Sequence, residues 1–234
     1  MIDKAAKAKR TSAIQYLTQL PEVFDLGHFV LLASTTPASA KVMLSRWAAQ
    51  GLIAHAGPHS GIYYKRLAQQ SSIDDQRACA ILTLYPAAMV SGPSVLHAHG
   101  WTTQIPRSLH VNVPATSRGV QLFDVALTRR PMKWFARVHE QKALALDHES
   151  TLATGGAWDR LRKLTPAWAL VDLLAHADGW QPDPDDLDIP EAAHDAVRHA
   201  AECLGVDIRS LADFGVDENG ASASKERSSN ELSY

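Results

Sequence analysis

Apolar residues at helical spacing mark the first elements of the chain. We predict a helix over residues 4–20, in which positions three or four apart form one apolar face, made by Ala13, Ile14, Leu17 and Leu20. Pro21 ends this helix, because proline cannot continue it. A second helix is predicted from Asp25 to Ala33, since Asp25 can cap it and Leu26, Phe29 and Val30 can face a core.

The third predicted helix has an unusual outward face. Thr36 can cap it, Pro37 suits its first turn, and Gly51 stops it after Gln50. One face is apolar and holds Ala40, Leu44, Trp47 and Ala48. The other face surrounds one long cation with small or polar residues, namely Ser39, Val42, Ser45, Arg46 and Ala49. A solvent-facing side normally carries more Glu and Lys, so this composition favours close approach to a groove.

After the third helix the pattern changes to that of short strands. Leu52–His55 and Ile62–Arg66 are predicted strands, joined by "AGPHSG", whose Gly and Pro supply turn geometry. Three helices followed by a β-hairpin form a winged helix, here predicted over residues 1–68. This variant of the helix-turn-helix places its third helix in the major groove and its hairpin beside the DNA backbone.

The rest of the chain predicts a second domain, residues 76–213, after the polar bridge Gln69–Gln76. We predict helices over residues 75–84, 94–99, 164–180 and 191–204, and strands over 108–114, 119–127 and 133–139. Thr165 is expected to cap its helix. Residues 214–234 contain few side chains able to pack, so we expect a disordered tail there. The fold class is therefore α+β, a winged helix followed by a mixed α/β domain.

Charge is distributed unevenly along the 234 residues. Residues 1–67 hold eight Lys and Arg against three acids, a net +5, whereas the remainder holds 15 against 22, a net −7. A basic head on an acidic body indicates an anionic partner for the head. No stretch reaches the ~20 apolar residues of a membrane span, and "MIDKAAKAKR" lacks the apolar core of a secretory signal. We therefore expect a cytoplasmic protein with no membrane partner.

Double-stranded DNA is the anionic partner that this pattern favours. Phosphate contacts are expected from the cations Lys4, Lys7, Lys9, Arg10, Lys41, Lys65 and Arg66. Arg46 is different, because a guanidinium on the reading face can bind guanine in a bidentate way, worth about 1–3 kcal/mol of discrimination. Ser39 and Ser45 can contact bases or phosphates. His59 and Ser60, at the tip of the hairpin, either reach the DNA or form a solvated turn.

Metal binding and nuclease activity are the two chemical alternatives to DNA binding. His97 and His99 form the closest histidine pair, but two residues apart on a helix they point in nearly opposite directions, so we expect no metal and no cofactor. A magnesium nuclease is the enzymatic alternative. Asp124 and the E-x-K triplet of Glu140 and Lys142, if they lie on neighbouring strands, could hold a metal and support an attacking water.

The order of segments resembles a known family. "RWAAQGLIAHAGPHSGIYY", "MVSGPSVLHAHGW", "LHVNVPATSRGVQLFDV" and "LTPAWALVDLL" follow one another as in the AbiEi antitoxins of type IV toxin-antitoxin pairs, over residues 5–178. The chain has Ser91-Gly92 where that family often has Ser-His, and the segment after Trp180 has no counterpart.

This resemblance implies a protein without enzymatic activity. Its winged helix would bind inverted repeats in its own promoter, repress the operon, and act with a second domain that neutralises a nucleotidyltransferase-like toxin. The matching DNA contacts would fall on Ser39, Lys41, Arg46, His59 and Lys65. A regulator without a toxin is the alternative among binding proteins.

Overall fold

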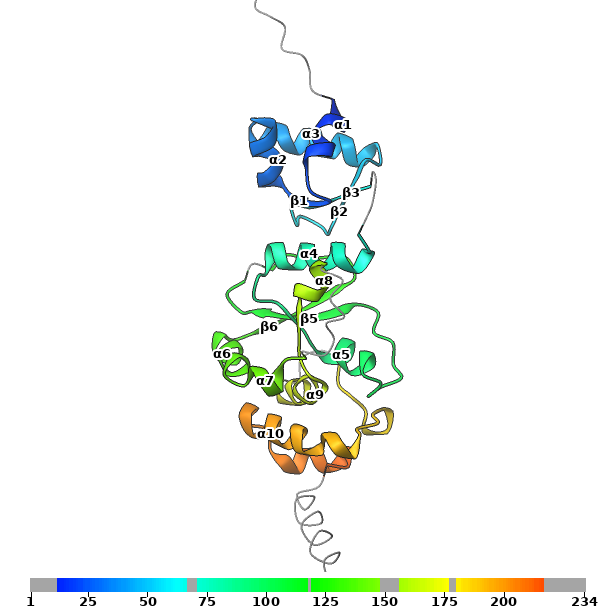
Figure 1. Cartoon of the computed structure of the whole chain (residues 1–234), viewed down its shortest axis with the longest axis vertical. Coiled ribbons are helices and arrows are strands. Elements are labelled where there is room, and N and C mark those ends of the chain that lie inside the picture. Colours follow the sequence, from blue (N-terminus) through cyan, green and yellow to red (C-terminus); the bar gives the residue numbers. More distant parts are fainter. Residues whose placement is uncertain (1–11, 67–70, 118, 148–155, 177–179, 217–234) are drawn as a thin grey trace, which may run out of the picture. The chain divides into compact units, whose positions relative to one another are not determined.

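The computed structural model describes residues 12–66, 71–117, 119–147, 156–176 and 180–216 (Figure 1). Over these residues the chain is α+β, with helices throughout and two separate sheets. Its contacts divide it into two compact units. The first unit comprises Met1–Leu84 with two later segments, Val120–Phe123 and Gly156–Trp158, and the second unit comprises the rest. The first unit therefore extends beyond the predicted 1–68 domain.

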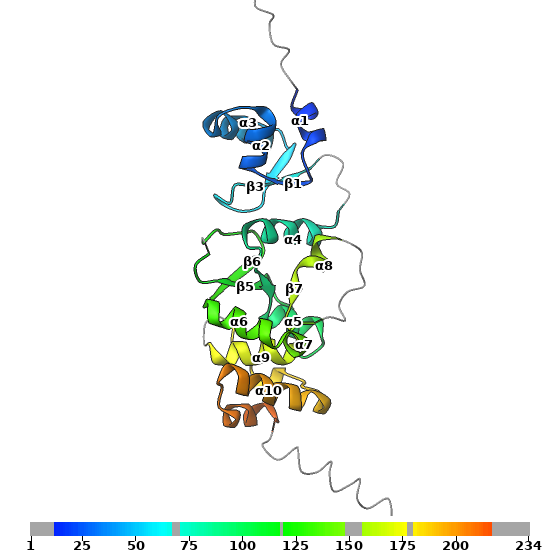
Figure 2. The same cartoon turned by 60° about the vertical axis from the view of Figure 1, so that its left-hand side comes forward.

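The first unit combines helices with a small antiparallel sheet. Its elements are α1 (Ala13–Gln19), β1 (Val23–Asp25), α2 (Leu26–Ala33), α3 (Pro37–Ala49), β2 (Ile53–His55), β3 (Ile62–Lys65) and α4 (Ile73–Leu84). The strand order is β1-β3-β2, so the hairpin of β2 and β3 is extended by the short strand before α2. Helices α1, α2 and α3 lie on the same side of this sheet (Figures 1 and 2).

Local sequence signals explain where α2 and α3 begin and end. Asp25 accepts a hydrogen bond from the His28 backbone N–H at 2.7 Å and so caps α2. Thr36 accepts one from the Ser39 backbone N–H at 3.2 Å and caps α3, which Pro37 opens. Gly51 has φ +72°, the left-handed conformation that glycine adopts after a helix. The predicted helices 25–33 and 37–50 are confirmed.

An aromatic cluster forms the core of the first unit. The rings of Phe29 and Trp47 meet edge to face with their centres 5.0 Å apart, and Phe24 stacks on Tyr63 at 5.5 Å. The apolar face of α3 packs into this cluster, because Ala40, Leu44 and Trp47 are all buried. The opposite face of α3 is thereby turned to the surface of the unit.

The second unit is built on a mixed sheet. Its strands are β4 (Met89–Val90), β5 (Leu109–Pro114), β6 (Val125–Arg130) and β7 (Arg162–Lys163), in the order β6-β5-β4-β7. Strands β5 and β6 are parallel, as are β4 and β7, whereas β4 and β5 are antiparallel. Its helices are α5 (Gly92–Ala98), α6 (Met132–Glu140), α7 (Lys142–Ala145), α9 (Pro166–Ala175) and α10 (His194–Leu204). The short helix α8 (Ala157–Arg160) begins in the Gly156–Trp158 segment of the first unit and ends in the second.

Helix α9 connects the sheet to the C-terminal segment. All its residues from Ala167 to Leu173 are buried. Helices α6, α7 and α9 lie on the same side of β5 and β6, and α10 lies beyond α9 (Figures 1 and 2). In the described part of this unit, short 3-10 helices also occur at Pro184–Asp186, Glu191–Ala193 and Ile208–Phe214.

Four local predictions need correction. The predicted strand over residues 119–127 begins only at Val125, where β6 starts. Residues 133–139 form most of helix α6 and not a strand, because Trp134, Phe135 and Val138 are buried at helical spacing. Thr165 does not cap α9 with its side chain; its hydroxyl donates to the Leu144 carbonyl at 2.9 Å. Val216 is fully buried, which corrects the predicted start of a tail at residue 214, and residues 217–234 lie outside the described part.

Within the described residues, no helix combines the length and the apolar character that crossing a bilayer requires.

Candidate functional site

The outer face of α3, which we define as Ser39, Lys41, Val42, Ser45, Arg46 and Ala49, is exposed at every one of these positions. Helix α3 contains two cations and no acidic residue. Ser39 also supports the start of the helix, because its hydroxyl accepts a hydrogen bond from Thr36 Oγ1 at 3.1 Å. The face is therefore a small, polar, positively charged surface. The opposite side of the same helix packs into the core of the first unit.

The hairpin presents one predicted site residue at its tip. His59 is exposed and has φ +54°, in the left-handed region, within the turn between β2 and β3. Ser60 is buried, accepts the Ile62 backbone N–H at 3.2 Å and donates to the Ile62 carbonyl at 3.4 Å. Ser60 therefore shapes the turn, and of the two tip residues His59 alone is placed to meet a ligand.

Lys65, at the base of the hairpin, forms hydrogen bonds within the fold. Its Nζ atom donates to the carbonyl of Leu17 at 2.9 Å and to that of Leu20 at 2.7 Å. Both carbonyls lie at the C-terminal end of α1, where backbone acceptors lack helical partners and attract a cation. Two of the three ammonium donors of Lys65 are thus used within the fold. Arg66, one residue later, is exposed.

The other predicted phosphate contacts belong to the N-terminal segment. Lys4, Lys7, Lys9 and Arg10 all lie before residue 12, outside the described residues. Of the predicted set, the structure brings Lys41 and Arg46 together with Ser39 and Ser45 on one helix face.

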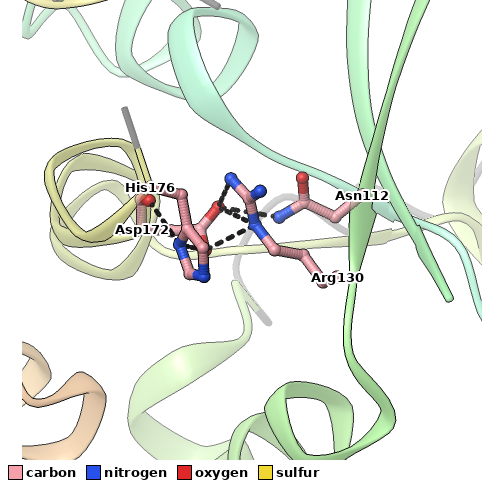
Figure 3. A network of polar contacts seen from close by, with 4 residues as sticks. All are labelled: Asn112, Arg130, Asp172 and His176. Carbon is pink, nitrogen blue, oxygen red and sulfur yellow. Dashed lines mark hydrogen bonds and ion pairs between the residues drawn. The ribbon is translucent and has the colours of Figure 1, made fainter. Parts of the chain in front are cut away.

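A second cluster, absent from the predictions, is buried in the second unit. Asp172 on α9 accepts hydrogen bonds from Arg130 Nε at 2.9 Å and from Arg130 Nη2 at 3.0 Å, a bidentate ion pair. Asn112 Nδ2 also donates to Asp172, at 2.9 Å, and His176 Nδ1 lies 3.3 Å from its carboxylate (Figure 3). The Arg130 and Asp172 side chains are each only 2% exposed.

The donors decide the charge state of this network. Burial by itself raises the pKa of Asp172, but hydrogen bonds from His176, Arg130 and Asn112, together with the charge of Arg130, outweigh it and lower that pKa below its ordinary value. The hydrogen bond to Asp172 raises the pKa of His176. Asp172 is therefore a carboxylate held between two strands and its own helix.

An open cavity of about 520 Å³ adjoins this network; we call it the sheet pocket. It is lined by His110 and Asn112 of β5, by Ala126, Thr128 and Arg129 of β6, and by Trp180. Arg130 and Asp172 also contribute to its wall. Burial lowers the pKa of His110, which favours the neutral ring.

The sequence contained one signal for this cluster. Asp172 interrupts the apolar run Leu170–Leu174 on the face of a predicted core helix. An acid at such a position must find buried partners, which marks it as part of a polar network. Its partner Arg130 lies 42 residues away, and nothing in the sequence pairs the two.

The histidine pair does not converge on one point. His97 Nδ1 lies 3.3 Å from the Thr102 carbonyl, whereas His99 Nε2 lies 3.3 Å from Asp147 Oδ2. Among the described residues, no group of three or more His, Cys, Asp or Glu side chains could hold a metal ion.

The geometry behind the nuclease alternative is also corrected. Glu140 ends helix α6 and Lys142 begins helix α7, so the E-x-K triplet lies on helices and not on a strand beside Asp124. Asp124 precedes β6 with φ +56°. The neighbouring-strand arrangement on which that hypothesis depended is therefore absent.

Comparison with known proteins adds no family. A scan against protein-family models gives no match to this chain, and a search of curated proteins gives none. The function is therefore inferred from the geometry of the chain and from the order of segments in its sequence.

Proposed function

We propose that this protein is a cytoplasmic, DNA-binding antitoxin that represses its own operon and neutralises a nucleotidyltransferase-like toxin. In this proposal the first unit is a winged helix, with α3 as the reading helix and the β2–β3 hairpin as the wing. The resemblance of the segment order to the AbiEi antitoxins supports the toxin connection, and the second unit is its proposed agent.

The outer face of α3 is the observation that carries the DNA-binding part. A helix can enter a major groove only where its side chains are small or can reach base edges. Here Ser39 and Ser45 flank Arg46, all three are exposed, and the helix carries no acidic residue that would repel phosphate. The buried Trp47 and Leu44 on the opposite side fix the rotation of the helix.

The contacts are proposed to divide into two kinds. Arg46 supplies base readout, because a guanidinium can donate two hydrogen bonds to guanine. Lys41, Arg66 and His59 are proposed to contact phosphates, which set affinity and its salt dependence. Lys65 contributes mainly by holding α1 in place, because its ammonium already bonds the Leu17 and Leu20 carbonyls. A protein bound across its promoter in this way excludes polymerase.

A gel-shift titration on the promoter inverted repeats and on random DNA, at two salt concentrations, tests this assignment. Arg46→Ala should weaken operator binding by roughly 5- to 150-fold and random binding far less, the equivalent of about 1–3 kcal/mol. Lys41→Ala should weaken both and reduce the salt slope by about one. Lys133→Ala removes an exposed cation on α6 and is the matched charge control. Equal losses on both DNAs for Arg46→Ala would contradict base readout by α3.

The antitoxin part has a separate test. If a neighbouring reading frame encodes a nucleotidyltransferase, its expression should arrest growth, and co-expression of this protein should restore it. The Arg46→Ala variant should still restore growth, because it changes only the DNA-facing surface. Failure of the unmodified protein to protect would remove the toxin connection and leave the repressor proposal intact.

A further inference from the structure

The strands give the sheet pocket a polar wall. Residues of β5 and β6 that are paired in register share one face of the sheet, since His110 is opposite Ala126 and Asn112 is opposite Thr128. This face is turned towards α9, because Asn112 bonds to Asp172 (Figure 3). A sheet face that a helix covers is ordinarily apolar. Helix packing alone therefore does not account for the polar residues at three of these four positions.

Three polar side chains of the lining are not engaged within the fold. In the part of the chain that the structure describes, the side chains of Ser91, His110 and Thr128 form no hydrogen bond. Each hydroxyl can donate and accept, and a neutral imidazole does the same through its two nitrogens. Burial lowers the pKa of His110 and so favours that neutral ring. These groups suit a ligand that itself both donates and accepts hydrogen bonds.

The charges of the described lining balance. The Arg130 guanidinium and the Asp172 carboxylate form a bidentate ion pair and neutralise each other. Arg129 precedes Arg130 on β6, so its side chain leaves the strand on the opposite face. Its Nη2 atom occupies the space that a Cβ at Gly119 would need, and Gly119 does not line the pocket. An uncharged ligand therefore matches the pocket, because an ion would lose water without gaining a countercharge.

The remaining lining includes apolar groups and a narrow approach between β5 and α9. A Cβ at Gly92 would lie 3.5 Å from Leu173 Cδ2 and 3.8 Å from His110 Cβ, so this glycine separates the helix from the strand. Trp180 also lines the pocket, and its indole Nε1 donates to Gln104 Oε1 at 3.0 Å. The volume of about 520 Å³ falls within the roughly 300–1,000 Å³ of typical ligand pockets.

We propose that the sheet pocket binds an uncharged nucleoside. The base has polar edges, which would bond to Ser91, His110 and Thr128, and apolar faces, which would pack against Leu173 and Trp180. A wholly apolar ligand would cover the polar wall without replacing its bonds to water. The inference does not depend on the proposed DNA binding or toxin neutralisation, since it concerns residues of the second unit alone.

Isothermal titration of the full-length protein with adenosine, guanosine, cytidine and uridine tests the proposal. The matching 5′-monophosphates and glucose are the comparison ligands. At least one nucleoside should bind with a Kd below about 1 mM, and its monophosphate should bind more weakly because the lining offers no countercharge. Thr128→Val removes one hydroxyl at nearly constant volume and should weaken the nucleoside about fivefold or more. Thr103→Val, at an exposed threonine outside the lining, is the matched control and should leave affinity within about twofold.

A second pair of variants lies on β6. Ala126→Leu should block binding by filling the pocket, whereas Val125→Leu, next to it and outside the lining, should leave affinity within about twofold. Three results would overturn the proposal: no nucleoside binding below about 1 mM, tighter binding of glucose or of the monophosphate than of the nucleoside, or equal effects of Thr128→Val and Thr103→Val.

Discussion

Asp172 shows how one residue can determine the polar interior of the second unit. It lies on a helix that is otherwise apolar at its buried positions, and its carboxylate is 2% exposed. Desolvation of such a group is offset only when several donors surround it. Arg130 and Asn112 reach it from neighbouring strands, and His176 reaches it from the position directly after α9. The single residue therefore ties the sheet to the helix.

Removing one partner of this ion pair should cost more than removing both. Arg130→Met leaves a buried carboxylate without its countercharge, and we expect a loss of about 3–5 kcal/mol in the free energy of unfolding. The double variant Arg130→Met with Asp172→Leu removes both charges and should recover part of that loss. Urea denaturation of both variants measures the difference, and a double variant less stable than Arg130→Met would contradict the buried-charge account.

The same network should make stability depend on pH through His176. The pKa of His176 is raised above its ordinary value of 6.5, so protonation favours the folded state. Its contribution is fully present below about pH 6.5 and is lost as the pH rises through the folded pKa. Asp172, whose pKa is lowered, stays ionised across this range and contributes until acid protonates it.

Substitution of His176 isolates this contribution. His176→Ala should destabilise the protein more at pH 5.5 than at pH 8.5, and because the side chain is 32% exposed, solvent limits the difference to about 1 kcal/mol. Denaturation curves at the two pH values measure it. His194→Ala, a histidine at the start of α10, serves as the comparison, and an equal pH dependence in both variants would rule out the assignment to His176.

At the scale of elements, two of the three predicted caps, Asp25 and Thr36, form as expected, whereas Thr165 does not cap its helix with its side chain. Asp25 and Thr36 define the starts of α2 and α3 through hydrogen bonds within three residues, which a sequence displays directly. The strand prediction for residues 133–139 was wrong, because aromatic and β-branched residues favour strands without requiring them. Burial of Trp134, Phe135 and Val138, with Ala136 and Arg137 exposed, follows a helical period and breaks strand alternation.

The packing of α1 provides a test at the same scale. We expect Lys65→Met to lower the free energy of unfolding by about 1–3 kcal/mol, because the Leu17 and Leu20 carbonyls lose a charged donor. Arg66→Met, the exposed neighbour, should be nearly neutral. Hydrogen exchange of the α1 amides locates the effect. Equal stability of both variants would mean that Lys65 does not anchor α1.

At the scale of the whole molecule, the chain builds its units from distant segments. The outer face of α3 could be predicted because its residues lie within eleven positions of one helix. The sheet pocket could not, because β5, β6, α9 and Trp180 meet only through strand pairing and helix packing. The same holds for the first unit, where Phe123 donates its backbone N–H to the Ala56 carbonyl at 2.9 Å. A domain boundary predicted near residue 68 leaves out this later segment, which packs in the first unit.

This return predicts how a shortened chain should behave. Gly57 is buried against Val120–Phe123, and a Cβ at Gly57 would lie 2.1 Å from the Gln121 carbonyl oxygen. In the full chain Gly57→Ala should therefore destabilise the first unit by about 1–3 kcal/mol, whereas Pro58→Ala, at an exposed position of the same turn, should cost less. Hydrogen exchange of the β2 and β3 amides measures the loss of stability in both variants.

The fragment of residues 1–84 provides the reciprocal measurement. It lacks Phe123 and Gln121, so it should melt several degrees lower than the first unit of the full chain, at about 4–8 °C per kcal/mol for this size. In the fragment the Gly57→Ala substitution meets no Gln121 carbonyl and should lose most of its cost. If Gly57→Ala is as costly in the fragment as in the full chain, the cost comes from the turn itself, and the first unit does not need the returning segment.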